Sequence, residues 1–132
     1  MNKQSKYINK TIYYIEDDDM SQILMSAFLK DNYPDYNVKT FDLVRVGKSY
    51  IEANGFPTIV ITDYKMPAGE DDGEFLIRWM ESIGFDNYIA WTGNSDELKQ
   101  NLHEFDFYCV EKHNYKKLTL VLNKILIMFN ID

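Results

Sequence analysis

The feature that most constrains the fold is an apolar, β-branched run, Ile59–Thr62, which ends on a single carboxylate, Asp63. Such a run is typical of a buried strand in a parallel sheet, where helices cover both faces of the strand. Asp63 is followed by a Met-Pro pair and an acidic loop that contains glycine. Because open α/β sheets place their ligand sites beyond the carboxyl ends of the strands, Asp63 is a candidate functional residue.

The rest of the chain alternates short β-rich runs with segments of helical periodicity. We expect strands at Thr11–Ile15, Tyr36–Phe41, Thr58–Thr62, Tyr88–Trp91 and Phe107–Val110. Each strand is followed by a predicted helix. In chain order, the apolar stripes of the five helices are Ile23, Leu24, Ala27 and Phe28; Leu43, Val44, Tyr50 and Ile51; Phe75, Leu76, Trp79, Met80 and Ile83; Leu98 and Leu102; and Leu118, Val121, Leu122, Ile125, Leu126 and Phe129. This order predicts an α/β fold with one five-stranded parallel, doubly wound sheet and right-handed crossovers.

Three helix boundaries carry their own signals. Asp18 or Asp19 can cap the first helix, and Asn54-Gly55 ends the second. Asn94 with Glu97 resembles a capping box at the start of the fourth helix, which we expect to reach about Glu104. Since that helix has only two apolar stripe residues, we expect it to be weakly held.

The composition suits a single domain of 132 residues, with 1–10 as a polar lead-in and 11–132 as the domain, leaving no room for an output domain. A formal charge of −7 argues against direct nucleic-acid binding and favours a basic partner surface or a bound cation. No apolar run approaches the roughly 20 residues of a membrane span, and Met1–Lys10 has no signal-peptide core. The lone Cys109, expected to be a small buried hydrophobe, points to a reducing, cytoplasmic location.

Polar side chains stand at the carboxyl ends of four predicted strands: Glu16 and Asp17, Asp63, Thr92, and Lys112. These ends lie along one edge of a parallel sheet, so the five groups can converge. Three close carboxylates repel unless a cation neutralises them, and Mg²⁺ prefers such oxygen ligands. A hydroxyl and an ammonium can bind the oxygens of a transferring phosphoryl group, so the set predicts phosphoryl transfer with Asp63 as the acceptor.

Over about Thr11–Asn130 the chain resembles a response-regulator receiver domain of two-component signalling. The matching motifs are Ile15-Glu16-Asp17-Asp18, Asp63-Tyr64-Lys65-Met66-Pro67 with the later Gly73, Ala90-Trp91-Thr92-Gly93, and Lys112. The resemblance implies a flavodoxin-like (βα)5 fold and a stand-alone chemotaxis-regulator-like receiver. It further implies that a histidine kinase or a histidine phosphotransfer protein phosphorylates Asp63 and that a downstream effector protein reads the result.

The same resemblance assigns the site residues. Glu16, Asp17, Asp63 and the backbone carbonyl of Lys65 would hold Mg²⁺, while Thr92 and Lys112 would bind the phosphoryl oxygens. Such a domain would be a signalling switch that phosphorylates and dephosphorylates itself at most, rather than an enzyme acting on other substrates.

The chain departs from the family pattern at three places. The loop Pro67–Gly73 is about two residues longer than usual and carries three acidic residues. His113 follows Lys112 where the family usually has proline, and the placement of the ammonium depends on that turn. Cys109 occupies the position of the usual aromatic switch residue, with Tyr108 one place away.

Two other functions compete with the leading one. The altered loop and the missing proline are also compatible with a pseudo-receiver that binds its partner without phosphorylation. Asp17-Asp18-Asp19 has the spacing of an aspartyl-nucleophile phosphohydrolase, although the chain is short for that class and the aliphatic run before Asp63 would be unexplained. His103 and His113 are expected to be surface residues rather than a metal pair.

The last predicted helix, Tyr115–Asn130, has a second apolar row: Leu120, Ile127 and Ile131. Exposed apolar surface usually marks a contact site, so one interpretation is a homodimer or partner surface on this helix. The alternative is a buried face that is wider than the core stripe alone.

Overall fold

The computed structural model describes residues 7–64 and 72–129. Within them lies one five-stranded sheet in the order β2-β1-β3-β4-β5, with every neighbouring pair parallel. The strands are β1 (Tyr7–Ile15), β2 (Asn37–Phe41), β3 (Phe56–Asp63), β4 (Tyr88–Thr92) and β5 (Tyr108–Glu111). The helices are α1 (Asp19–Asn32), α2 (Val44–Asn54), α3 (Gly73–Ser82), α4 (Ser95–Asn101) and α5 (Tyr115–Phe129). The predicted fold class, a parallel doubly wound sheet, is confirmed.

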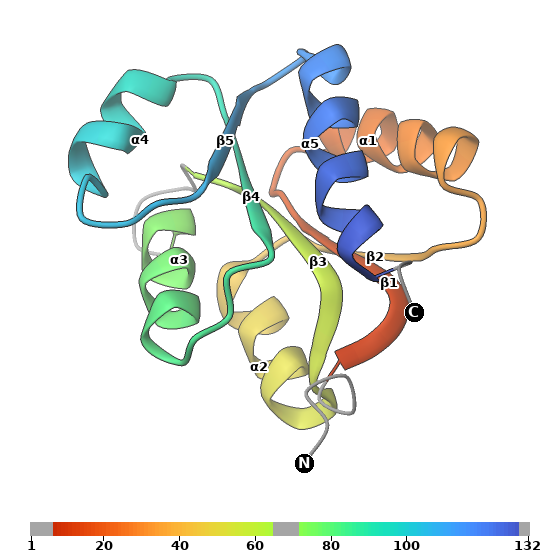
Figure 1. Ribbon diagram of the computed structural model, residues 1–132, viewed down its shortest axis with the longest axis horizontal. Helices are drawn as coiled ribbons and strands as arrows, with labels where there is room; N and C mark the ends of the chain where they lie inside the picture. The colour runs from red at the N-terminus through yellow and green to blue at the C-terminus, as the bar shows by residue number, and fades with distance from the viewer. Residues whose placement is uncertain (1–6, 65–71, 130–132) are drawn as a thin grey trace.

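The helices form two layers that cover both faces of the sheet. Figure 1 shows α1 and α5 on one side of the sheet, with α2, α3 and α4 on the other. Each face has its own apolar core, in which alternate residues of the strands meet the facing helices. The all-apolar run in β3 therefore follows from its position at the centre of the sheet, buried on both faces.

The strand order reverses between β1 and β3. From β1 the chain crosses to β2 on one side, and from β3 it proceeds to β4 and β5 on the other. Open α/β sheets bind ligands beyond the carboxyl ends of the strands at this point of reversal. The residues that leave β1 and β3 there are Glu16, Asp17 and Asp63.

The first strand starts at Tyr7, four residues before the predicted start at Thr11, so the predicted lead-in overlaps the strand. A register shift between Ile8 and Ile12 interrupts its pairing with β3, and Lys10 has a positive φ of 51°. The Thr58 hydroxyl bridges the irregularity by accepting from the Thr11 N–H (3.3 Å) and donating to the Ile8 carbonyl (3.2 Å). A bulge removes the alternation on which sequence prediction depends, which explains the missed residues.

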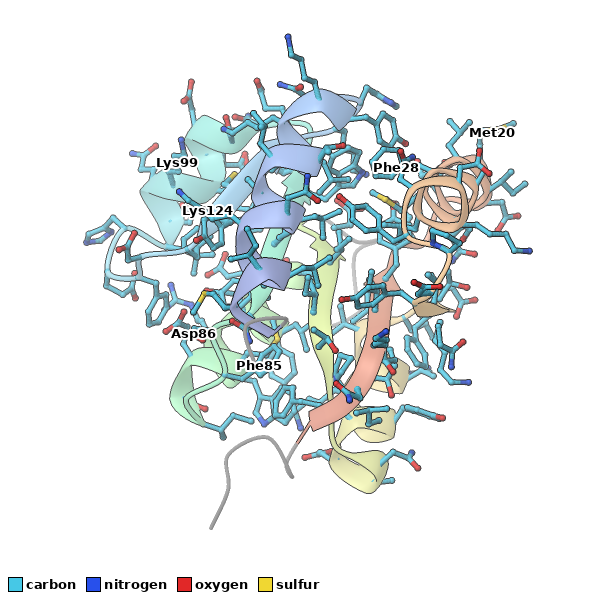
Figure 2. The ribbon with its side chains drawn as sticks, turned by 45° about the vertical axis from the view of Figure 1, so that its right-hand side comes forward. Met20, Phe28, Phe85, Asp86, Lys99 and Lys124 are labelled. Carbon is cyan, nitrogen blue, oxygen red and sulfur yellow. The ribbon has the colours of Figure 1, made fainter. Side chains whose placement is uncertain are left out.

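The predicted stripe of α1 was wrong in its phase. Ile23 and Leu24 are 63% and 45% exposed, whereas Met25 and Leu29 are buried. This helix has apolar residues around most of its circumference, so spacing alone does not select the buried face. Its orientation follows from the Asp18 cap, which accepts from the Ser21 N–H, and from contacts further along the helix. Phe28 points toward α5, where its ring lies 4.8 Å from that of Tyr115, while Met20 points outward (Figure 2).

Two residues of the predicted α3 stripe, Phe75 and Ile83, are also exposed, and Ile77 is buried in their place.

The expectations for the start of α4 and for Cys109 are confirmed. The Asn94 side chain caps α4 by accepting from the Glu97 N–H, and Leu98 and Leu102 are fully buried, although the helix ends at Asn101 rather than near Glu104. Cys109 is buried within β5, and burial raises the pKa of its thiol.

The second apolar row of α5 lies on the surface. Leu120 and Ile127 are 66% and 62% exposed, so the alternative of a wider buried face is wrong. Ile131, the third residue of the row, lies outside the described residues. Of the predicted core stripe, Leu118, Leu122, Ile125 and Leu126 are buried and Val121 is half-buried, while the side chain of Phe129 lies outside the description.

We predict that Gly73→Ala destabilises the protein by about 1–3 kcal/mol, the usual range for forced overpacking. The Gly73 N–H donates to the Tyr64 carbonyl (3.0 Å), and an added Cβ would lie 2.0 Å from the Asp63 carbonyl oxygen. Urea unfolding measures the loss. Gly93→Ala is the matched control because nothing lies within 4 Å of its Cβ position, and it should change the free energy of unfolding by less than about 0.5 kcal/mol. Equal effects of the two substitutions would contradict the packing argument.

Candidate functional site

The centre of the site is a lysine held between two buried carboxylates. Lys112 Nζ lies 3.1 Å from Glu16 Oε1 and 3.2 Å from Asp63 Oδ2. Glu16 is fully buried and Asp63 is 5% exposed. The three side chains come from the ends of β1, β3 and β5, which are far apart in the sequence.

Strand register accounts for this convergence. Ile15 pairs with Thr62, so the residues that follow them, Glu16 and Asp63, leave neighbouring strands at the same level. On the other side, the Lys112 N–H donates to the Thr92 carbonyl (2.8 Å), which continues the β4–β5 ladder by one step. His113, which follows Lys112, adopts a φ of 74°, and the turn it forms leaves the ammonium beside Asp63.

Glu16, Asp17 and Asp63 form an acidic cluster. Each offers a carboxylate oxygen that lies within 4.8 Å of the others, and Asp17 is exposed to solvent while the other two are buried. A set made only of oxygens suits a hard divalent cation such as Mg²⁺, Mn²⁺ or Ca²⁺. The predicted metal-ligating side chains are therefore brought together; Lys65, whose carbonyl was the fourth predicted ligand, lies outside the described residues.

The ionisation of the cluster reflects its crowding. Burial and the neighbouring Glu16 carboxylate raise the pKa of Asp63 to about 7, although Lys112 opposes the shift. Partial burial, with Glu16 nearby, also raises the pKa of Asp17. Burial disfavours the Lys112 ammonium, but Asp63 and Glu16 outweigh this effect, so the pKa of Lys112 is raised as well. One lysine thus compensates the cluster only in part, and a cation would complete the compensation.

A pocket of about 290 Å³ opens beside Asp63 and Lys112. It is lined by Asp63, Thr92, Gly93, Asn94, Glu97 and Lys112. The Thr92 hydroxyl accepts from the Asn94 N–H (3.1 Å), which holds it at the start of the turn into α4. The pocket has room for a group the size of a phosphoryl beside Asp63 and Lys112, and Thr92 is part of its lining.

Sequence reasoning missed the groups that hold Glu16. The Tyr14 hydroxyl donates to Glu16 Oε1 (2.8 Å), and the Gln22 side-chain amide donates to the Glu16 carbonyl. The first could have been found from strand alternation, because residues two apart share a face. Tyr14 is fully buried within an apolar strand, so its residue type and position alone suggest a core aromatic.

A second network links the residue after Asp63 to α3 and the end of α4. The Tyr64 hydroxyl donates to Glu74 (3.0 Å) and accepts from the Asn101 side-chain amide (2.6 Å). Arg78 pairs with Glu74 (3.2 Å) and Glu104 (2.7 Å), and also donates to the Asn101 carbonyl (3.0 Å). Any displacement of Tyr64 would therefore disturb its hydrogen bond to Asn101 at the end of α4.

The two histidines are both exposed and take no part in the acidic cluster of the described chain, as expected of surface residues. Of the long acidic loop, only Asp72 and Gly73 are described; Asp72 caps α3 by accepting from the Phe75 N–H (3.2 Å). Among residues 7–64 and 72–129, none of the helices has both the length and the apolar content needed to cross a membrane.

Comparison with known proteins identifies the fold. No family model and no curated protein matches the chain. Among solved structures, the bacteriophytochrome response regulator AtBRR is similar with a TM-score of 0.75 and 14% identity, over 89% of this chain and 93% of that one. The phosphorylated cyanobacterial phytochrome response regulator RcpA has a TM-score of 0.67 and 18% identity, over 86% and 89%. The Mn²⁺-bound response regulator Rcp1 has a TM-score of 0.66 and 18% identity, over 85% and 88%. The chain has the fold of response-regulator receiver domains.

We predict that Asp63→Asn is more stable than the wild type at about pH 8 without divalent cations, by roughly 1–3 kcal/mol after discounting for screening. The pKa of Asp63 is about 7 in the folded protein and 3.8 ordinarily, so the wild type loses stability relative to the variant as the pH rises through this window. Below it Asp63 is protonated and resembles asparagine. Urea unfolding of both proteins in EDTA, at about pH 5 and about pH 8, measures the difference, and a difference independent of pH would contradict the crowding argument.

Proposed function

We propose that this protein is a phosphorylation-dependent receiver in which Asp63 accepts a phosphoryl group. The observation that carries the proposal is the meeting of Asp63 with Glu16, Asp17 and Lys112 beside a pocket that Thr92 also lines. This set contains a nucleophile, a cation site and a positive clamp, the parts that phosphoryl transfer requires. The fold and the order of the motifs agree with the same function.

In this proposal, Glu16, Asp17 and Asp63 hold a divalent cation, with Mg²⁺ as the physiological ion and the Lys65 carbonyl as a further ligand. A cation there supplies positive charge to the phosphoryl oxygens as they approach the carboxylates. It also favours the ionised form of Asp63, whose pKa would otherwise leave much of the carboxyl protonated near neutral pH. That Rcp1 binds Mn²⁺ and RcpA is phosphorylated on the same fold supports this reading.

The chemical step is a displacement at phosphorus. A carboxylate oxygen of Asp63 attacks the phosphorus of a phosphohistidine on a kinase or phosphotransfer protein. The new O–P bond forms an acyl phosphate, and the N–P bond breaks as its electron pair returns to the imidazole. Lys112 follows the charge onto the phosphoryl oxygens, and the Thr92 hydroxyl donates to one of them.

The switch would reach a partner through α4. This helix has seven residues, of which Leu98 alone is apolar and buried, with Leu102 buried at its C-cap, so small changes at Thr92 can shift its position. The Tyr64 network gives a second route, because Asn101 and Glu104 connect the end of α4 to α3. A downstream effector protein that recognises this face would then read the phosphorylation state.

The first test is incubation with Mg²⁺ and a small acyl-phosphate donor, followed by intact mass measurement. We expect one added phosphoryl group in the wild type, none after EDTA treatment before the reaction, and none in Asp63→Asn. Asp86→Asn, a substitution at the opposite edge of the sheet, is the matched control and should leave the adduct unchanged.

The other outcomes separate the competing functions. If the wild type binds Mg²⁺ but forms no adduct, the protein acts as a pseudo-receiver without phosphorylation. Turnover of a phosphomonoester with labelling of Asp17 would instead indicate a phosphohydrolase. Absence of both adduct and cation binding would show that the site is not functional.

The exposed row on α5 leads to a prediction about assembly. We expect the wild type to self-associate in sedimentation experiments and Ile127→Glu to weaken that association, because the substitution puts a charge in the middle of an apolar surface. Ile23→Glu, at a residue equally exposed on α1, is the control and should leave the association intact. A wild-type monomer at high concentration, with and without a phosphate analogue, would contradict a homodimer.

A further inference from the structure

Tyr14 contacts the proposed cation site without belonging to its acidic cluster. It stands two residues before Glu16 on β1, so the two side chains project from the same face of the sheet. Its hydroxyl donates to Glu16 Oε1 at 2.8 Å, the same oxygen that lies 3.1 Å from Lys112 Nζ. Glu16 Oε1 therefore has two donors, one neutral and one charged.

The other oxygen of Glu16 is much less occupied. Within the described part of the chain, Glu16 Oε2 accepts only a long hydrogen bond, 3.4 Å from the Asp18 N–H. Donors on one oxygen leave the lone pairs of the other available to a cation. The arrangement thus distinguishes the two oxygens and leaves Oε2 as the one with the freer lone pairs.

Glu16 needs such a constraint more than an aspartate would. A glutamate has one more rotatable bond, and fixing it costs side-chain entropy that weakens cation binding. Lys112 alone does not provide the constraint, because in the proposed reaction its ammonium turns to the phosphoryl oxygens. A phenol remains a neutral donor at physiological pH and has no charge for the incoming phosphoryl group to attract.

The Tyr14 ring is itself rigidly held. Its side chain is fully buried, and its backbone lies on β1 between β2 and β3, where the residue pairs with Thr40 and Ile61. It belongs to the core formed with α1 and α5, which includes Met25 and Leu118. A hydroxyl on such a ring has little freedom, and groups behind a metal ligand are effective when their own positions are locked.

We infer that Tyr14 is a positioning residue that holds the Glu16 carboxylate in the orientation required to bind the divalent cation. The inference rests on the proposed function and extends it to a residue outside the acidic motif. It makes cation affinity, rather than the phosphoryl transfer step, the property that depends on Tyr14.

The test is a direct titration of Mg²⁺ and Mn²⁺ by calorimetry against the wild type and Tyr14→Phe. Phenylalanine keeps the ring and its packing and removes only the hydroxyl. We expect a loss of about tenfold in cation affinity, the lower end of the range for partners of metal ligands. Saturating Mg²⁺ should restore the full extent of Asp63 phosphorylation, because the substitution leaves the nucleophile and the positive clamp in place.

Tyr88→Phe is the matched control. Tyr88 is also a fully buried tyrosine that donates to a glutamate, with its hydroxyl 2.7 Å from Glu81 Oε2, but it stands at the start of β4, away from the strand ends that form the site. It should lose stability comparably and keep its cation affinity. A second control is Tyr14→Phe in a Glu16→Asp background, where the shorter carboxylate no longer reaches the hydroxyl, and there the substitution should cost less than about twofold.

Three results would overturn the inference. Unchanged cation affinity in Tyr14→Phe would show that the hydrogen bond does not position Glu16. An equal loss in Tyr88→Phe would show that general destabilisation, not positioning, lowers the affinity. Absence of cation binding by the wild type would overturn the proposed function together with the inference, whereas wild-type binding with an unaffected Tyr14→Phe overturns the inference alone.

Discussion

The ammonium of Lys112 is the interaction on which the rest of the site depends. It lies between Glu16 and Asp63, two carboxylates that are almost completely excluded from water. Without a nearby positive charge, this pair would be costly to bury in ionised form. β5 supplies this positive charge at the level where β1 and β3 bring the two carboxylates together. Lys112 therefore affects both the packing of the strand ends and the charge of the acidic cluster.

The same lysine compensates the negative charge of the acidic cluster only in part. One positive charge faces three carboxylates, and the raised pKa of Asp63 reflects the charge left uncompensated. In the proposed function, a divalent cation would add positive charge to this balance, and a phosphoryl group would draw Lys112 away from Glu16. In such a site, a neutral hydrogen-bond donor can keep its contact with Glu16 while the surrounding charges change. Tyr14 is placed to be that donor.

The sequence was enough to predict the layout of the site because strand ends in a parallel sheet share an edge. Asp63, Glu16, Asp17, Thr92 and Lys112 could be named from that rule and from the receiver resemblance, and the structure brings their positions together at one edge. What sequence patterns did not reveal depends on side-chain direction and on irregular backbone. The α1 stripe lacked a unique apolar face, the bulge near Lys10 broke the alternation of β1, and Tyr14 looked like any core aromatic. These features are determined by packing partners that are distant in the sequence.

The Tyr64 network is a polar link between the residue after Asp63 and α4. In the proposed function, a change at Asp63 is transmitted to α4, and packed contacts between the two are one means of coupling. Cys109 is too small to act as a side chain that moves between two positions, and it is buried in β5. Tyr64, directly after Asp63, has its hydroxyl bound to α3 through Glu74 and to the end of α4 through Asn101. Since the backbone of Asp63 and Tyr64 is also closely packed against Gly73, a movement of Asp63 would pull on α3 and α4 together. The α4 face can in this way respond to Asp63 with a polar link in place of an aromatic one.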